Sequence, residues 1–221
     1  ENTRIIVSSL PELEVPLNNQ QIENLPVLPV QEAEQILSRW LEAVNRTLTD
    51  QQQQEVLDKF NHSQLPIYLK LAYEMAKHWN SYTPEYALKE DVKGIINSFI
   101  DSLYNEHNKE FVQDVICLML CGRYKGLAEN EILEIFAFDE NGKDGLWDKF
   151  LKTTHKEHRQ ELIDMKNELN GSMKIPIVVW SRLFLDLEPF LTERDADGVP
   201  IITFFHRQFN EVLEERYELV K

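Results

Sequence analysis

The chain has 221 residues and a net charge of −15, with 43% hydrophobic and 28% charged residues. These proportions are ordinary for a globular protein, and 11 Phe, 7 Tyr and 4 Trp are enough for a sizeable core. The acidic balance, with no run of Lys or Arg, argues against nucleic acid as a partner and against an anionic membrane surface. Both need clustered cations to meet phosphate groups.

No apolar run reaches the roughly 18 residues that a membrane span requires. The first residues, "ENTRIIVSSLPE", lack the basic and apolar regions of a signal peptide. The only two cysteines, Cys117 and Cys121, have apolar neighbours in "VICLMLCGRY". We expect them to be reduced core residues, which fits a cytoplasmic location.

The N-terminal segment "RIIVSSLP" predicts a buried strand that ends in a Ser-Ser turn. No later segment resembles a parallel partner for it, so the strand lies at a sheet edge or the chain is a piece of a larger protein. The proline-rich residues 10–30 predict an extended connector.

A helical block follows. Apolar residues at helical spacing predict a helix over 31–46, and Thr49 with Gln52 predicts a capping box at the start of the next helix. Pro66 is placed to begin a third helix, and 88–107 is a long amphipathic helix.

The second block begins near residue 108 with an apolar helix that Gly126 ends, followed by a short helix within "GLAENEILEIF". Further helices lead to a strand, an Asp197-Gly198 turn, a returning strand "IITFF" and a final helix. The side chains of Trp180 and Phe204 are expected in the core. The sequence therefore predicts a mainly α protein: residues 1–30 as a strand and connector, a helical bundle over 31–107, and a winged-helix domain with a two-stranded hairpin over 108–221.

Three places are candidates for chemistry. Ser8 and Ser9 follow a strand, where hydroxyls and free amides often face a phosphate. The helix that Pro66 begins offers an N-terminus for an anion. His206 follows the returning strand and is either a local cap or a ligand contact.

Other chemistries find less support. His155 and His158 form an H-x-x-H pair in a polar stretch, which leaves a metal-dependent hydrolase as a weak alternative. There is no G-x-S-x-G, G-x-x-x-x-G-K-[ST] or G-x-G-x-x-G, so a nucleophile elbow and a glycine-rich phosphate loop are missing.

Taken in order, these features resemble the C-terminal part of the nucleotide-binding core of STAND-class P-loop NTPases, the NACHT and related group, including nephrocystin-like, telomerase-associated-like and bacterial antiviral members. In that family a strand with a "T-S-R-P"-like end is sensor 1, a "G-x-P" loop packs on adenine, and a winged-helix His touches the β-phosphate of ADP. Here "SSLP" with Ser8 and Ser9 matches sensor 1, "QLP" (Gln64, Leu65, Pro66) matches the loop, and "FFHRQF" supplies His206.

The resemblance implies a switch that holds ADP or ATP with Mg in the intact protein and that forms a homo-oligomer on activation, in immune or signalling defence. Leu10 stands where many members carry the sensor Arg, and Gln64 replaces the Gly of the loop. Walker A and B segments are absent from this sequence, so the chain alone is expected to bind no nucleotide tightly and to be inactive; its partners would include the other domains of the parent protein.

The alternative is a non-enzymatic winged-helix module that contacts protein or DNA. The acidic balance weakens the DNA version, and a gel shift at low salt would distinguish it from the switch.

Overall fold

The computed structural model describes residues 23–82, 88–136, 160, 163–164 and 177–219. Its helices over the first half are α1 Val30–Ala43, α2 Asp50–Ser63, α3 Pro66–Ala76 and α4 Val92–Glu106. The remaining elements are α5 Lys109–Cys121, β1 Gly126–Leu127, α6 Glu129–Ile135, α9 Ile177–Leu187, a short 3-10 helix Glu188–Phe190, β2 Leu191–Ala196, β3 Val199–Phe204 and α10 Arg207–Arg216.

Local signals set the helix starts. Thr49 and Gln52 form the predicted capping box of α2, with the Gln52 N–H donating to the Thr49 hydroxyl at 3.3 Å and the Thr49 N–H donating to the Gln52 amide oxygen at 3.0 Å. Pro66 is the first residue of α3, as predicted. Asp91 and Asn108 cap α4 and α5 through the N–H groups of Gly94 and Phe111.

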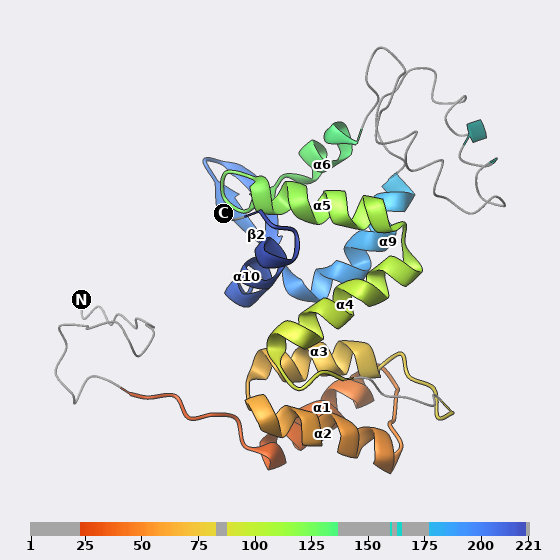
Figure 1. Cartoon of the computed structure of the whole chain (residues 1–221), viewed down its shortest axis with the longest axis vertical. Coiled ribbons are helices and arrows are strands. Elements are labelled where there is room, and N and C mark those ends of the chain that lie inside the picture. Colours follow the sequence, from red (N-terminus) through yellow and green to blue (C-terminus); the bar gives the residue numbers. More distant parts are fainter. Residues whose placement is uncertain (1–22, 83–87, 137–159, 161–162, 165–176, 220–221) are drawn as a thin grey trace.

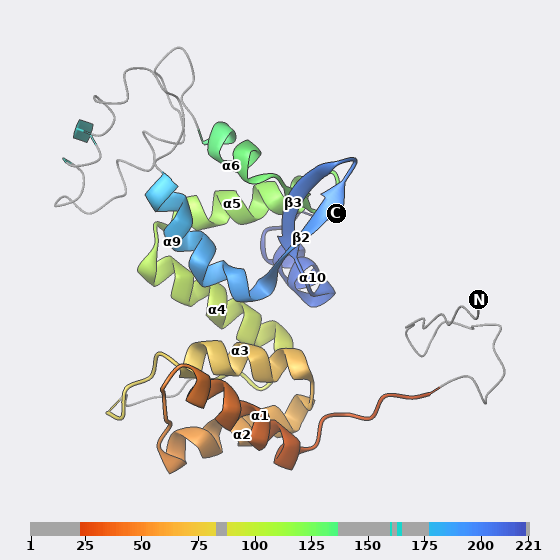
Figure 2. The same cartoon turned by 180° about the vertical axis from the view of Figure 1, so that it is seen from behind.

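Helices α1, α2 and α3 pack on one another, and α3 is the most buried of them, with almost every side chain from Ile67 to Ala76 covered. Helix α4 packs on α3 on one side and on α5 and α10 on the other. Figures 1 and 2 show it crossing between the lower group α1–α3 and the upper group of α5, α9, α10 and the sheet. Nearly all the buried apolar side chains that the structure describes form one continuous cluster, from Ala33 to Leu213.

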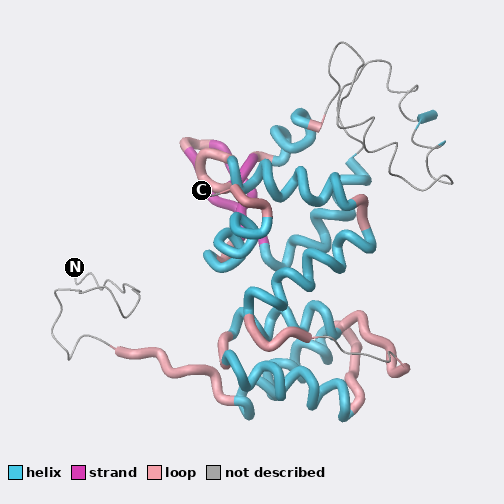
Figure 3. The backbone as a smooth tube through the Cα atoms, in the orientation of Figure 1, coloured by secondary structure: helices cyan, strands magenta, loops and turns pink. Residues whose placement is uncertain are grey.

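The sheet has three antiparallel strands in the order β1-β3-β2, gathered in one region beside α10 (Figure 3). The predicted hairpin β2–β3 is confirmed, with Asp197 (φ 56°) and Gly198 (φ 86°) in the left-handed conformations of a type I′ turn. The third strand, β1, was not predicted. Gly126 is needed there, because a Cβ at that position would lie 2.6 Å from the Ile202 carbonyl oxygen of β3.

Aromatic side chains fill the space between the sheet, α10 and α4. Phe204 stacks on Phe209 with ring centroids 5.1 Å apart, and Phe190 lies 5.0 Å from Phe209 and 4.7 Å from Phe99 of α4. Trp180 is fully buried, as predicted, and its indole N–H donates to Glu129 at 2.8 Å. The predicted burial of Phe204 is also confirmed, at 1% exposure.

The prediction for the cysteines was wrong in part. Both thiols are free, but Cys121 is exposed and Cys117 only half buried. The core face of α5 carries Phe111, Val112, Val115, Ile116, Met119 and Leu120 instead. An apolar helix of this composition has more apolar residues than one face holds, so apolar neighbours in sequence did not imply burial.

Among the described residues, no helix combines the length and apolarity needed to cross a membrane.

Candidate functional site

The predicted site residues fall in three places. Ser8 and Ser9, together with the His155/His158 pair, lie outside the described residues. Gln64, Leu65 and Pro66 form the turn between α2 and α3, and His206 is the N-cap of α10.

The α2–α3 turn has a defined backbone shape. Gln64 ends α2 in the left-handed conformation (φ 51°, ψ 26°), and its N–H donates to the Phe60 carbonyl at 2.8 Å. Glycine is the residue that most easily adopts this conformation after a helix. The Gln64 carbonyl accepts the N–H of Leu28 at 3.2 Å, which attaches the end of the connector to the turn.

The turn presents an apolar surface. The Leu65 side chain is 38% exposed and is followed at once by Pro66. The N–H groups of Tyr68 and Leu69 both donate to the Leu65 carbonyl, at 2.9 and 3.3 Å. The first turn of α3 therefore uses these amides internally and offers a ligand an apolar side chain.

The ring of His206 caps α10. Its Nδ1 accepts the N–H of Gln208 at 3.3 Å, and the ring is half buried, with its plane at 75° to the ring of Phe205. Burial, and then the neighbouring Arg207, lower the pKa of His206 below its ordinary value. The ring is therefore neutral near pH 7. With Nδ1 accepting, the ring hydrogen lies on Nε2, which leaves that nitrogen as a donor.

The turn and His206 are linked through α4. Within the ranges that the structure describes, no hydrogen bond or ring contact joins His206 to Gln64, Leu65 or Pro66. Their helices α3 and α10, however, both pack on α4. The position of α10 on α4 thus sets where His206 lies relative to the turn.

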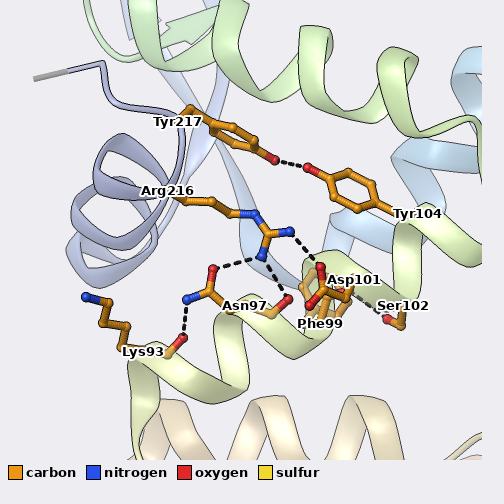
Figure 4. Close-up of polar contacts among 8 residues, drawn as sticks. All are labelled: Lys93, Asn97, Phe99, Asp101, Ser102, Tyr104, Arg216 and Tyr217. Atoms are coloured by element: carbon orange, nitrogen blue, oxygen red, sulfur yellow. Dashed lines mark hydrogen bonds and ion pairs between the residues drawn. The ribbon is translucent and has the colours of Figure 1, made fainter.

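A polar cluster holds α10 on α4 (Figure 4). We call it the α4–α10 junction, and it comprises Asn97, Asp101, Tyr104, Arg216 and Tyr217. One Arg216 nitrogen donates to the Asn97 side-chain and main-chain oxygens at 2.8 and 3.2 Å, and the other donates to Asp101 at 2.6 Å. The guanidinium carbon lies 5.2 Å from the Tyr104 ring centroid.

The two tyrosines close the junction. Their hydroxyl oxygens are 2.6 Å apart, so one donates to the other. Burial first, and then this hydrogen bond, raise the pKa of Tyr217. Two ion pairs flank the cluster: Lys93 with Glu215 at 2.5 Å, and Lys125 with Glu214. The last turn of α10 is therefore fixed from several sides.

Sequence reasoning missed this junction. The available signal was the spacing of Asn97, Asp101 and Tyr104, which places three polar groups on one face of α4 between its apolar positions. Such a stripe is usually solvated, and only the fold shows that Arg216 covers it.

Comparison with known proteins gives distant relatives. Human NACHT domain- and WD repeat-containing protein 1 is 25% identical over 186 residues, covering 84% of this chain and 11% of that protein. The mouse protein of the same name is 26% identical over 149 residues (67% and 8%), and mouse NACHT and WD repeat domain-containing protein 2 is 22% identical over 191 residues (83% and 10%). The chain thus spans about a tenth of the length of the curated relatives it matches. No family model and no solved structure matches the chain. The chain is therefore distantly homologous to part of NACHT domain-containing, multidomain proteins.

Proposed function

We propose that this chain is the helical and winged-helix portion of a nucleotide-controlled NACHT switch, in which His206 binds a phosphate of ADP in the intact protein. The observation that carries the proposal is the hydrogen bond at Nδ1 of His206. Its Nδ1 is engaged by the α10 backbone, so the neutral ring presents a single N–H donor at Nε2. A phosphate oxygen is a strong acceptor for such a donor.

Two further observations support the same assignment. The α2–α3 turn offers the exposed Leu65 beside Pro66, which suits the apolar face of a base. The order α5, β1, α6, then α9, β2, β3, with β1 beside β3, supports the winged-helix identification.

The switch would use the α4–α10 junction. With nucleotide bound, His206 and the junction together hold α10 on α4. Loss of the phosphate contact would leave only the junction to hold α10 on α4. Release of α10 from α4 would then let the intact protein assemble into a homo-oligomer. We place this switch in the cytoplasm, in defence or signalling.

The test uses the intact parent protein and the His206→Asn variant. Asparagine keeps an N-cap for α10 but is too short to reach where Nε2 lies. We expect ADP to bind at least about tenfold more weakly, since a hydrogen bond to a charged group contributes about 1.5–3 kcal/mol. The exposed His62→Asn on α2 is the matched control.

The same samples are examined by light scattering with and without ADP, and His206→Asn is expected to form oligomers at ADP concentrations that keep the wild type monomeric. An unchanged ADP affinity in His206→Asn would exclude the phosphate contact.

A further inference from the structure

We propose that Glu106, His107 and Asp186 bind a divalent transition-metal ion, Zn²⁺ first among them, that ties the end of α4 to α9. One ligand atom from each residue lies within 4.8 Å of the other two. Glu106 and His107 end α4, and Asp186 lies in the last turn of α9. This cluster is separate from His206 and from the α2–α3 turn.

The donor set selects the metal. One imidazole nitrogen and two carboxylate oxygens suit Zn²⁺, which takes three protein ligands and a water in open sites. Mg²⁺ and Ca²⁺ prefer all-oxygen surroundings, so the imidazole disfavours them. Mn²⁺ accepts the same set and is expected to bind more weakly than Zn²⁺.

Two of the three ligand atoms already lie side by side. Nε2 of His107 and Oδ2 of Asp186 are 2.6 Å apart, and the His107 side chain is only 12% exposed. The His107 N–H donates to the Leu103 carbonyl at 2.8 Å, which fixes the residue at the end of α4. Two ligands on tetrahedral Zn²⁺ lie about 3.3 Å apart, so the ion requires these two atoms to separate by roughly 0.7 Å more than the 2.6 Å seen here. When Nε2 of His107 binds the ion, the ring hydrogen of His107 sits on Nδ1.

The electrostatic setting favours a cation. The C-terminal end of α4 carries the negative end of the helix dipole, and two carboxylates lie beside it. The chain as a whole carries −15. Glu106 is exposed, so its side chain is free to rotate toward the ion without disturbing the core.

Glu106 separates this proposal from a simple hydrogen bond. The His107–Asp186 contact alone would tie α4 to α9 and would not involve Glu106. The decisive variant is therefore Glu106→Gln, which keeps the size of the side chain and removes its charge. Because Glu106 is exposed, this variant is expected to fold like the wild type. Glu110→Gln, an exposed change in the first turn of α5, is the matched control.

The 221-residue chain, freed of metal, is titrated with Zn²⁺ by calorimetry, and its melting temperature is followed. We expect one saturable site that raises the melting temperature. Zn²⁺ affinity should fall at least tenfold in Glu106→Gln and further in His107→Gln, and stay unchanged in Glu110→Gln. Co²⁺ serves as a spectroscopic probe, and its spectrum should lack thiolate charge-transfer bands, which excludes binding at Cys117 and Cys121.

The proposal would be overturned by the absence of saturable Zn²⁺ binding, or by an affinity that is the same in the wild type, Glu106→Gln and His107→Gln. Loss of binding in His155→Gln/His158→Gln with full binding in Glu106→Gln would also overturn it, since the ion would then occupy a different site.

Discussion

Gln64 occupies a backbone conformation that glycine adopts more easily. A residue other than glycine in the left-handed region costs about 1–2 kcal/mol of stability. Substitution by glycine recovers only part of this, because glycine gives the unfolded chain more conformational freedom. We therefore expect Gln64→Gly to raise the free energy of unfolding by up to about 1 kcal/mol in urea denaturation.

Gln64→Ala is the control, because it removes the same side chain without relieving the backbone. Equal stability of the two variants would show that the left-handed conformation carries no cost here.

The His206 cap makes a pH-dependent contribution to stability. Protonating Nδ1 would remove the acceptor for the Gln208 N–H and place a charge in a half-buried position beside Arg207. The pKa of His206 is therefore lower in the folded than in the unfolded chain, and the unfolded chain takes up the proton first. The stability from this residue is present above the ordinary value of 6.5 and is lost as the pH falls toward the lowered pKa.

The measurement compares the wild type with His206→Asn in urea at about pH 7.5 and about pH 5. Asparagine caps α10 without a titrating group, so the free energy of unfolding of the wild type relative to the variant should fall at the lower pH. A difference between the two that stays constant, or that moves in favour of the wild type on acidification, would contradict the capping role assigned to the neutral ring.

At the scale of elements, Arg216 is the main polar link between α10 and α4. Arg216→Ala leaves Asp101 and the Asn97 oxygens without their donor, and we expect a loss of about 2 kcal/mol in the free energy of unfolding. The stability of Arg216→Lys should lie between those of the wild type and Arg216→Ala, because an ammonium group keeps the charge but cannot reproduce the forked geometry of the guanidinium.

Arg207→Ala is the matched control on the same helix. Its ion pair with Glu211 at 3.0 Å joins two exposed side chains, so its loss should cost less than about 0.5 kcal/mol. If both alanine variants were equally stable, the junction would not hold α10 in place.

The elements differ in how far sequence could predict them. The capping box of α2, the start of α3 at Pro66 and the Asp197-Gly198 turn were predicted because each depends on a few neighbouring residues. Strand β1 was missed because its two residues become a strand only by pairing with β3, 75 residues further along the chain from Leu127 to Ile202.

The same distinction holds for the site. The positions of His206 and of Gln64, Leu65 and Pro66 at helix ends could be read from local sequence, whereas Arg216 and Asn97 are 119 residues apart. No local pattern identifies which polar stripe on α4 receives a partner. The roles of the predicted residues in nucleotide binding stay predictions, and Ser8 and Ser9 lie outside the described part of the chain.

At the scale of the whole molecule, the single core cluster joins the helices α1–α3 to the sheet region through α4. Phe204 in β3 and Leu37 in α1 are each 1% exposed. Phe204→Ala should lower the free energy of unfolding by about 3–5 kcal/mol and Leu37→Ala by about 2–5 kcal/mol, through lost contacts and a residual cavity.

Because the core is continuous, we expect each variant to unfold in one transition that far-UV circular dichroism and tryptophan fluorescence report at the same denaturant concentration. Two separated transitions, with Phe204→Ala shifting only one of them, would mean that the two ends of the molecule unfold independently.

The junction also sets an order of events during synthesis. Arg216 and Tyr217 emerge from the ribosome more than a hundred residues after the face of α4 that they cover. Helices α1–α4 have by then had several seconds to pack, at the usual rate of about 5–20 residues per second. The contacts of Arg216 and Tyr217 with that face of α4 can therefore form only after α1–α4 have had time to pack on one another.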